Sequence, residues 1–386
     1  MLAMVGLTLF SILYRDYLSS SIWAAGFVFP ALCYAIMRIS CLRLKTNVLV
    51  DKKMLYANQP LKIQLELENK FIVPTAGCQA NVSVHYAFYD EKNYIVLNTS
   101  AFALNKQSVT YTIYPEHLGR VDVRVEEILV WDPFNLFCRH IKCASKAGFD
   151  VMPENERSHV YISDAFFNKI EESDRFSAVR GGDDPSEVFQ VREYREGDKL
   201  QRVHWKLSAK LDQMMFKEGS MPIQTSAMLL LDLCYEEDNS QRKYCIDAAI
   251  TALTTISTAF LREGLDHNIC WYNENFATLQ TRRVTTEDEL FIAVSEIYSS
   301  GVSKNEHHTM QSAMMEPELF RIRPIYVSPN AQSSVFEGMP AMVKERLIAI
   351  DVGVFGETDG EQYDREVRTI GIDCHHPNHG LDNLVL

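Results

Sequence analysis

The sequence lacks the short motifs by which several large enzyme classes are recognised. Its 386 residues contain no phosphate-binding G-x-x-x-x-G-K-[ST] loop, no dinucleotide-binding G-x-G-x-x-G and no G-x-S-x-G nucleophile elbow. The nine cysteines are scattered and odd in number, and no two are separated by two residues, which argues against a zinc ribbon or a disulfide framework and favours a reducing compartment. No small-molecule substrate is evident from these patterns.

Positive charge is also scarce. Lysine and arginine number 38 against 51 aspartates and glutamates, a formal net charge of −13. An acidic chain of this kind does not attach to nucleic acid by bulk electrostatics, so any basic binding site must be local. The length indicates two or three structural units, each able to bury its own core.

Residues 1–40 carry two uncharged apolar runs, Met1 to Tyr14 and Ile22 to Met37, joined by a short loop. Each run is slightly shorter than the roughly 20 residues that a spanning helix needs. Basic residues follow the second run, so the positive-inside bias places the bulk of the chain in the cytoplasm. We therefore expect a transmembrane hairpin anchor with two short spans in the cell membrane, with a secretory signal peptide as the alternative.

Residues 44–152 show an alternation of apolar and polar side chains. It is clearest at Leu61, Ile63, Leu65 and Leu67, and turn sequences such as "ANQP", "HLGR" and "DPFN" separate the apolar segments. Strands with one polar face, separated by short turns, are typical of an antiparallel sandwich. We expect an all-β immunoglobulin-like sandwich that serves as a binding module or as a spacer.

Residues 227–386 alternate between buried strands and helices. The run "AMLLLDL" predicts a strand buried on both faces, a helix then ends at Gly264, Thr286 begins another helix, and "RIRPIYVS" and a last strand "IAIDVGVF" follow. This order predicts an α/β doubly wound sheet. Ligands bind at the carboxyl ends of such strands, which indicates Asp232 and Ser328.

A basic segment, "REYREGDKLQRVHWKLSAK", lies between the two predicted domains. Asp198 is a plausible N-cap, and a helix from Lys199 would align four basic residues near Trp205: Lys199, Arg202, Lys206 and Lys210. Such a stripe is either a solvated face or a docking surface for an acidic partner or an anionic headgroup.

The same segment resembles the domain of unknown function 58 family. The resemblance includes the upstream "HLGR" and "DPFNLF" and a central motif made of Arg192, Glu193, Tyr194, Gly197, Asp198 and His204. It implies a membrane-tethered protein of no established activity, in which residues 153–226 are a linker with the family motif and residues 227–386 form a von Willebrand factor A-like domain. It also implies a MoxR-type AAA+ ATPase as partner.

A von Willebrand factor A-like domain that binds Mg²⁺ usually presents Asp-x-Ser-x-Ser after its first strand. Here the corresponding run is Asp232-Leu233-Cys234-Tyr235-Glu236, in which a sulfur and a longer carboxylate replace the two hydroxyls. Mg²⁺ at Asp232 and Glu236 is the one candidate cofactor, and an acidic loop that caps the next helix is the alternative.

Three functional hypotheses follow. The leading one is a non-catalytic, membrane-tethered scaffold or adaptor that binds a protein partner at the basic stripe and acts in envelope or complex assembly. The second is a divalent-cation-dependent hydrolase with its site at Asp232 and Glu236. The third is a purely structural envelope component.

Overall fold

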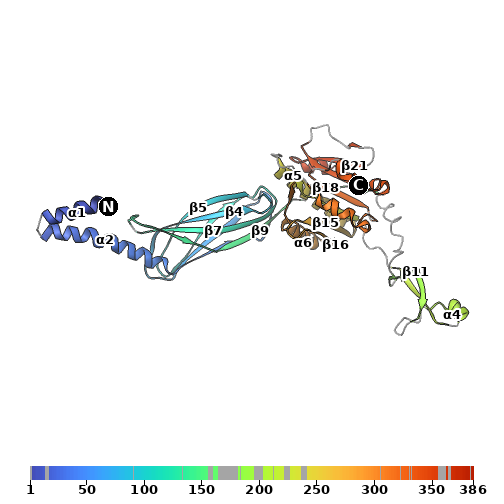
Figure 1. Ribbon diagram of the computed structural model, residues 1–386, viewed down its shortest axis with the longest axis horizontal. Helices are drawn as coiled ribbons and strands as arrows, with labels where there is room; N and C mark the ends of the chain where they lie inside the picture. The colour runs from blue at the N-terminus through green and yellow to red at the C-terminus, as the bar shows by residue number, and fades with distance from the viewer. Residues whose placement is uncertain are drawn as a thin grey trace. The chain divides into compact units, whose positions relative to one another are not determined.

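In the computed structural model the chain divides into two compact units, Met1–Met152 and Pro153–Leu386 (Figure 1). The structure describes residues 2–13, 17–89, 91–132, 134–154, 160–163, 181–182, 184–194, 203–211, 213–220, 227–235, 241–304, 306–321, 323–329, 331, 333–354, 362–363, 367–382 and 384–386.

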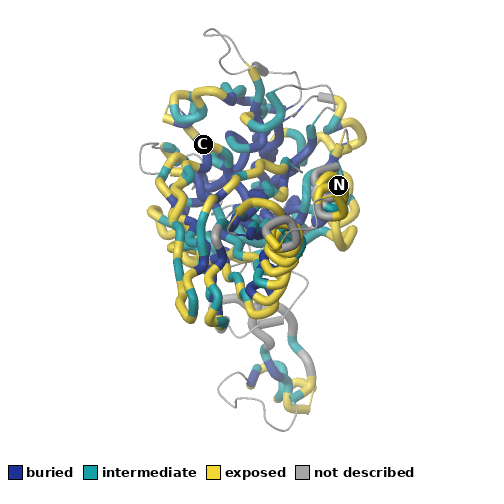
Figure 2. The backbone as a smooth tube through the Cα atoms, turned by 90° about the vertical axis from the view of Figure 1, so that its left-hand side faces the viewer, coloured by how far each residue is buried: buried dark blue, intermediate teal, exposed yellow. Residues whose placement is uncertain are grey.

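The first unit begins with two apolar helices that contact each other, α1 (Leu2–Leu13) and α2 (Tyr17–Cys41). The stretch Ser21–Cys41 of α2 is long and apolar enough to cross a membrane. Most residues of this stretch are exposed, and Figure 2 colours the backbone by this exposure. Helix α5 (Arg242–Arg262) passes the same test of length and composition but is mostly buried in the second unit, so it is a core helix.

Two β-sheets complete the first unit, in the orders β1-β3-β6 and β2-β9-β7-β4-β5, with β8 pairing with β7. All neighbours except β2 and β9 are antiparallel. The alternation in β3 places Leu61, Ile63, Leu65 and Leu67 in the core, which confirms the predicted period of two. The strands are β1 (Leu44–Val50), β2 (Met54–Tyr56), β3 (Leu61–Asn69), β4 (Thr75–Tyr86), β5 (Glu91–Ala101), β6 (Asn105–Ile113), β7 (Gly119–Trp131), β8 (Cys138–Lys142) and β9 (Lys146–Met152).

The second unit contains a seven-stranded sheet in the order β16-β15-β13-β18-β19-β21-β20. Its five central strands are parallel, and β16 and β20 pair antiparallel at the two edges. The strands are β13 (Ala227–Leu231), β15 (His267–Asn273), β16 (Thr278–Val284), β18 (Pro324–Ser328), β19 (Ile348–Gly353), β20 (Gln362–Tyr363) and β21 (Arg368–Asp373). This α/β arrangement agrees with the predicted doubly wound sheet. The prediction that "IAIDVGVF" is the last strand is wrong, because β21 continues the parallel sheet beyond β19.

Helices cover both faces of this sheet. Met228 and Leu230 of β13 pack into a core with α7, whereas α5 packs against β13, β18 and β19. Helix α5 ends before Gly264, whose φ of 70° lies in the left-handed region that favours glycine, and the Thr286 hydroxyl caps α6 (Glu287–Tyr298), both as the sequence predicts. The remaining helical segments are α7 (His308–Met314), η2 (Pro317–Arg321), η3 (Ser333–Phe336), α8 (Ala341–Lys344) and α9 (Pro377–Leu381).

The segment between the predicted domains contains a small sheet, ordered β10-β12-β11, and a short helix. These elements are β10 (Gly181–Gly182), β11 (Asp184–Glu193), α4 (Trp205–Leu211) and β12 (Met215–Ser220). Val203 is buried and forms a β-bridge with Phe216. The prediction of one continuous helix from Lys199 is therefore wrong, because this backbone pairing holds Val203 in an extended conformation and α4 begins only at Trp205.

Candidate functional site

The strand order places Asp232 at the switch point of the seven-stranded sheet. Asp232 follows β13, whose neighbours β15 and β18 lead away in opposite directions, and a ligand site is expected at this position in doubly wound folds. Its side chain is only 2% exposed, although a buried carboxylate is costly without partners. The hydroxyl of Tyr326, on β18, donates to Asp232 Oδ2 at 3.0 Å, and the backbone N–H of Met310 donates to the same oxygen at 3.2 Å.

His307 completes this buried cluster, which we call the Asp232 cluster: Asp232, His307 and Tyr326. Its Nδ1 lies 3.6 Å from Asp232 Oδ2 and 3.0 Å from the Tyr326 hydroxyl oxygen. Burial alone would lower the pKa of His307, but hydrogen bonds to Asp232 and Cys234 and the negative charge of Asp232 outweigh it, and the pKa rises to about 9. The imidazole is therefore a cation at neutral pH.

Local backbone pairing brings His307 to this position. A two-stranded parallel ladder joins β14 (Cys234–Tyr235) to β17 (Ser303–Lys304), so the loop that precedes α7 is fixed beside the end of β13. Thr309 then donates its hydroxyl to the Leu231 carbonyl oxygen at 2.9 Å and accepts a hydrogen bond from the Tyr272 N–H. These contacts hold the start of α7 against two strands, with the Met310 N–H directed at Asp232.

A second carboxylate lies at the same end of the parallel strands. Asp351, on β19, is opposite the buried Ser328 in the register of the strands and accepts a hydrogen bond from the Ala331 N–H at 2.8 Å. Burial raises the pKa of Asp351, while this hydrogen bond and the nearby His307 lower it. Ser328, the other predicted strand-end residue, has no exposed surface.

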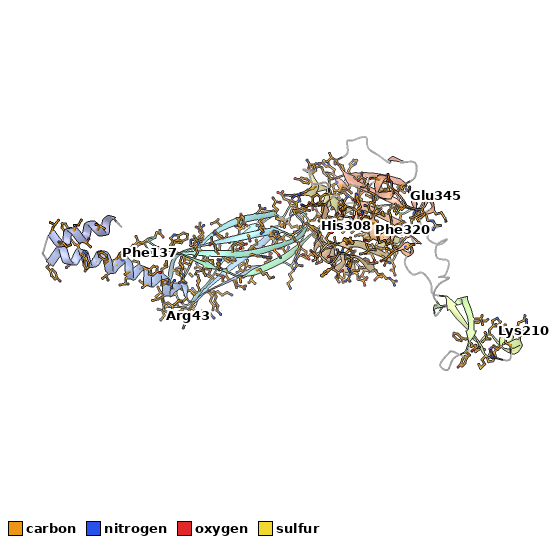
Figure 3. The ribbon with its side chains drawn as sticks, viewed as in Figure 1. Arg43, Phe137, Lys210, His308, Phe320 and Glu345 are labelled. Atoms are coloured by element: carbon orange, nitrogen blue, oxygen red, sulfur yellow. The ribbon has the colours of Figure 1, made fainter. Side chains whose placement is uncertain are left out.

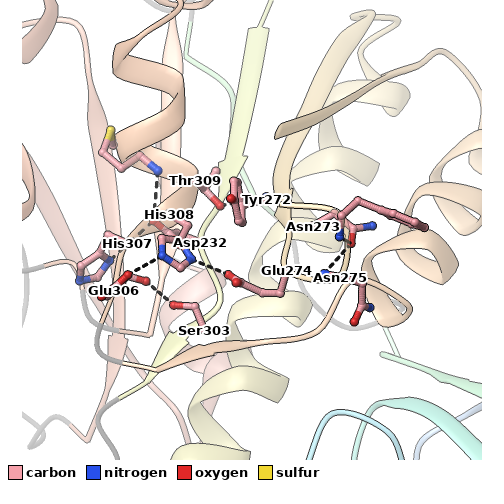
Figure 4. Close-up of polar contacts among 12 residues, drawn as sticks. Asp232, Tyr272, Asn273, Glu274, Asn275, Ser303, Glu306, His307, His308 and Thr309 are labelled. Carbon is pink, nitrogen blue, oxygen red and sulfur yellow. Dashed lines mark hydrogen bonds and ion pairs between the residues drawn. The ribbon is translucent and has the colours of Figure 1, made fainter. Parts of the chain in front are cut away.

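A more exposed histidine forms the rim of the site. His308 Nδ1 lies 2.8 Å from Glu274 Oε1, and its Nε2 lies 2.5 Å from Glu306 Oε2 (Figure 4). The hydrogen bond to Glu274 raises the pKa of His308; partial burial lowers it, and the bond to Glu306 raises it further. Because the two carboxylates hold opposite nitrogens of one ring, they do not converge on a common point where a metal ion could bind.

The surroundings of Asp232 do not fit a Mg²⁺ ion. One carboxylate oxygen already accepts two hydrogen bonds, and the His307 cation supplies the positive charge that a metal would bring. Cys234 is fully buried, and sulfur is a poor ligand for Mg²⁺. Within the described residues no group of three or more ligating side chains is arranged to hold a metal. Glu236 lies outside those residues, so its pairing with Asp232 stays a prediction.

The space beside the Asp232 cluster is small. A cavity of about 10 Å³, lined among others by Asp232, Trp271, Tyr272 and Glu274, has room for about one water molecule. Small-molecule sites usually enclose several hundred Å³. The cluster therefore neutralises a buried charge and holds β13, β18 and α7 together, and the cavity that Asp232 lines with Tyr272 and Glu274 is too small for an organic substrate.

The predicted docking residues are described only in part. Lys199 and Arg202 lie outside the described residues. Lys206 and Lys210 are exposed, one turn apart on α4, and Trp205 at the start of this helix is 64% exposed. Figure 3 shows Lys210 on this helix. The structure thus places a large exposed aromatic ring on the same short helix as two exposed positive charges.

The described residues of the central motif have structural roles. The Arg192 and Glu193 backbones pair with Phe216 and Met215 across β11 and β12, and the Tyr194 N–H donates to the Met214 carbonyl oxygen. His204 Nδ1 accepts from the Leu207 N–H at 3.2 Å, which stabilises the start of α4. Gly197 and Asp198 lie outside the described residues.

Sequence reasoning missed His307 and Tyr326. His307 stands in a polar stretch of the sequence that gives no sign of burial, yet its side chain is largely buried against Asp232. A signal was present: an aspartate at the end of a strand buried on both faces needs a donor or a cation. The sequence does not show which of eleven histidines supplies it.

The comparison with solved structures gives only distant likenesses. The chain is similar to the CARDB domain of the PF1109 protein from Pyrococcus furiosus, solved in complex with di-metal ions, at 11% identity and a TM-score of 0.22, covering 29% of this chain and 94% of that chain. The C-terminal domain of wzt matches at 8% identity and a TM-score of 0.23, with 29% and 75% covered. For the Pseudomonas fluorescens alkylpurine DNA glycosylase AlkC, bound to DNA, identity is 14%, the TM-score is 0.19, and 36% and 42% are covered. Such likenesses carry no argument about function.

The comparison of sequences is more specific. No curated protein matches the chain. Residues 190–277, which run from the end of β11 through α4, β12, β13 and α5 to the strand after it, match one family model. That model describes a protein of unknown function, DUF58, and the match supports the family that the central motif of the sequence resembles.

Proposed function

We propose that this protein is a non-catalytic scaffold, tethered to the membrane by its N-terminal helices, which binds an acidic protein partner through α4. The observation that carries this proposal is that Trp205, Lys206 and Lys210 are all exposed on one short helix. An exposed tryptophan flanked by cations is typical of the anchor residues that dominate protein interfaces. In a chain of net charge −13, a local basic surface also attracts a partner of opposite charge.

The second unit supports a binding role better than a catalytic one. Its switch-point carboxylate is neutralised within the protein, and the adjacent cavity is about the size of one water molecule. We propose that this domain is von Willebrand factor A-like and that the β-sandwich, predicted to be immunoglobulin-like, spaces it from the bilayer. The resemblance to the family makes a MoxR-type AAA+ ATPase the proposed partner, with complex or envelope assembly as the setting.

Membrane attachment is part of the same proposal. The Ser21–Cys41 stretch of α2 has the length and composition of a spanning helix. Its exposed side chains are mainly apolar, so the helix presents no polar face to water. Arg38, Arg43 and Lys45 follow its apolar stretch, so the positive-inside bias supports a cytoplasmic location for the rest of the chain. With α1 as a second, short span, the protein would be multi-pass.

Charge reversal on α4 tests the scaffold role. The double substitution Lys206→Glu and Lys210→Glu is expected to reduce recovery of the AAA+ ATPase at least about tenfold, because each charge then repels an acidic partner. Trp205→Ala alone is expected to cost at least about 2 kcal/mol of binding free energy, or about thirtyfold in affinity. The measurement is detergent extraction of the tagged full-length chain from its own host, followed by cross-linking and quantitative mass spectrometry.

The matched control is Lys62→Glu with Lys92→Glu, which reverses two exposed lysines on the β-sandwich and changes the net charge equally. It is expected to leave recovery unchanged. Equal recovery from the α4 variant and from this control would refute the docking role of α4. Loss of the ATPase from both would show that only the net charge matters.

A further inference from the structure

At one end of the β-sandwich formed by the two sheets of the first unit, three loops lie beside α2: residues 70–74, residues 102–104, and residues 132–137, of which 133 lies outside the described residues. We call this the α2 end, because β1 follows α2 directly there. The pairing of the strands places the loops together, since each begins or ends at this edge: Leu44 is opposite Asn69, Asn69 opposite Asn105, Thr75 opposite Ala101 and Gly77 opposite Trp131.

The loops of the α2 end expose large apolar side chains. The exposed fractions are 73% for Ile72, 55% for Phe102, 69% for Leu104, 60% for Phe134 and 52% for Leu136. Loops of soluble domains are usually built from polar residues and glycine, and a gathering of exposed apolar side chains marks an interaction surface. At the opposite end Tyr114 is exposed, but the aromatic rings of Phe88 and Tyr89 are buried and Lys52 and Lys53 are exposed.

Buried polar side chains satisfy backbone groups in two of these loops. Asp132, with no exposed surface, accepts hydrogen bonds from the Phe134 N–H at 3.1 Å and the Phe137 N–H at 2.6 Å. Asn69, 1% exposed, accepts from the Phe71 N–H and donates to the Val73 carbonyl oxygen. Irregular backbone is tolerated near hydrocarbon only when its polar groups are paired within the protein. These loops therefore expose apolar side chains and pair several of their own amides inside.

The 132–137 loop also lies along α2. The Phe137 ring is 5.5 Å from the Tyr34 ring, and the Phe134 ring is 4.9 Å from the Phe29 ring, each between ring centroids. Figure 3 shows Phe137 at the end of the sandwich, beside α2. Phe29 precedes the end of α2 at Cys41 by twelve residues, or about 18 Å of helix. The loop therefore lies alongside the middle of α2, and not only beside its C-terminal end.

Helix length determines what this contact means in a bilayer. The twelve residues of α1 extend about 18 Å, less than the roughly 30 Å of a hydrocarbon core, whereas the 25 residues of α2 are long enough to cross it by themselves. A span of about 20 residues that ends near Arg38, the first charged residue after the apolar stretch, includes Phe29. Phe134, in contact with Phe29, then lies at membrane depth as well.

We propose that the α2 end of the sandwich is inserted in the membrane, with its three apolar loops among the lipid headgroups and acyl chains and the 132–137 loop deepest, alongside α2. The occupant of this surface is lipid, because the exposed apolar surface of α2 continues onto Phe134 and Leu136. This inference rests on the proposed membrane anchor. It adds that the sandwich sits directly on the bilayer and does not move freely on a tether.

Single-tryptophan reporters in lipid vesicles test the inference. In full-length protein whose four tryptophans are replaced by phenylalanine, one reporter is restored or added per variant: Trp23, Phe102→Trp, Phe134→Trp or Tyr114→Trp. Tyr114 is exposed at the opposite end of the sandwich, beyond β6, and serves as the matched control. The vesicles contain phosphatidylcholine with brominated acyl chains, which quench nearby indole fluorescence.

We expect the reporters at 23, 102 and 134 to lose most of their fluorescence, with 134 more quenched than 102, and the reporter at 114 to keep its intensity. Quenching at 23 alone would overturn the inference and leave the anchor standing. No quenching at any position would refute the anchor itself. Fluorescence that is blue-shifted but unquenched at 102 and 134 would show that protein, such as a second copy of this chain, covers the surface, which also overturns the inference.

Discussion

Replacing Asp232 with alanine is expected to lower the free energy of unfolding of the second unit by about 3–5 kcal/mol. The substitution removes the acceptor of the Tyr326 hydroxyl and the Met310 N–H, together with the charge that keeps His307 protonated, so three buried polar groups lose their partner. Removing one member of a buried charged cluster lowers the free energy of unfolding by more than the intact cluster contributes. The reason is that the remaining members stay desolvated and lose their partner. The loss should therefore exceed that of an ordinary surface substitution several-fold.

Urea unfolding of the full-length chain measures this loss. Trp271 on β15 is buried in the second unit and reports on it when Trp23, Trp131 and Trp205 are replaced by phenylalanine. The control is Asp266→Ala, which breaks the partly exposed ion pair with Arg283 in the same unit and should cost less than about 1 kcal/mol. A loss for Asp232→Ala no larger than for Asp266→Ala would contradict the structural role of the cluster.

The same variant separates this role from the hydrolase alternative. If the His307 cation takes the place of a metal ion, Mg²⁺ leaves the unfolding midpoint of the unaltered chain unchanged, and calorimetry shows no binding. The double variant Asp232→Ala with His307→Ala should recover part of the lost stability, because the buried imidazole that lost its partner is then absent. A Mg²⁺-dependent rise in midpoint that disappears in Asp232→Ala would instead favour a cation site.

The second large effect is a bell-shaped dependence of stability on pH, centred near pH 6.5. The pKa of His307 is about 9 in the folded chain against 6.5 unfolded, so its contribution is fully present below pH 6.5 and is lost as the pH rises through 9. A difference of about 2.5 pKa units corresponds to about 3 kcal/mol. Asp232 is the principal charge that faces His307, and Asp351 is the other carboxylate close to it.

The acid limb of the bell comes from a different histidine. His267 on β15 has no exposed surface, and its Nε2 lies 2.6 Å from the Ser257 hydroxyl oxygen on α5. Burial lowers its pKa to about 4, although the hydrogen bond to Leu265 and the charge of Asp266 act in the opposite direction. The unfolded chain then binds the extra proton between pH 6.5 and 4, so stability falls by about 3 kcal/mol as the pH drops through this range.

Urea unfolding with the Trp271 reporter, repeated between pH 4 and 9, tests both limbs. His307→Gln should flatten the alkaline limb only, and His267→Gln should flatten the acid limb only. His375→Gln alters an exposed histidine of the same unit and should leave the profile unchanged. An alkaline limb that persists in His307→Gln would show that another group carries it.

The repeating patterns of the sequence were enough to identify most of the regular structure. Alternation in β3 and the buried run of β13 follow from the periods with which side chains meet a core, and Gly264 and Thr286 mark helix ends through local backbone chemistry. Asp232 could be predicted at a strand end because strand direction and sheet type are local properties. The antiparallel β16 was missed, because its charged and polar side chains resemble those of a loop.

What the sequence by itself determined is local: which segments are apolar, which alternate, where helices end, and the motif that resembles DUF58. The partners of Asp232 were decided only by the tertiary structure, because Tyr326 and His307 are 94 and 75 positions away in the chain and no short-range pattern links them. The break before α4 likewise depends on pairing between Val203 and Phe216. Charge neutralisation and backbone pairing act across space, so only the fold reveals them.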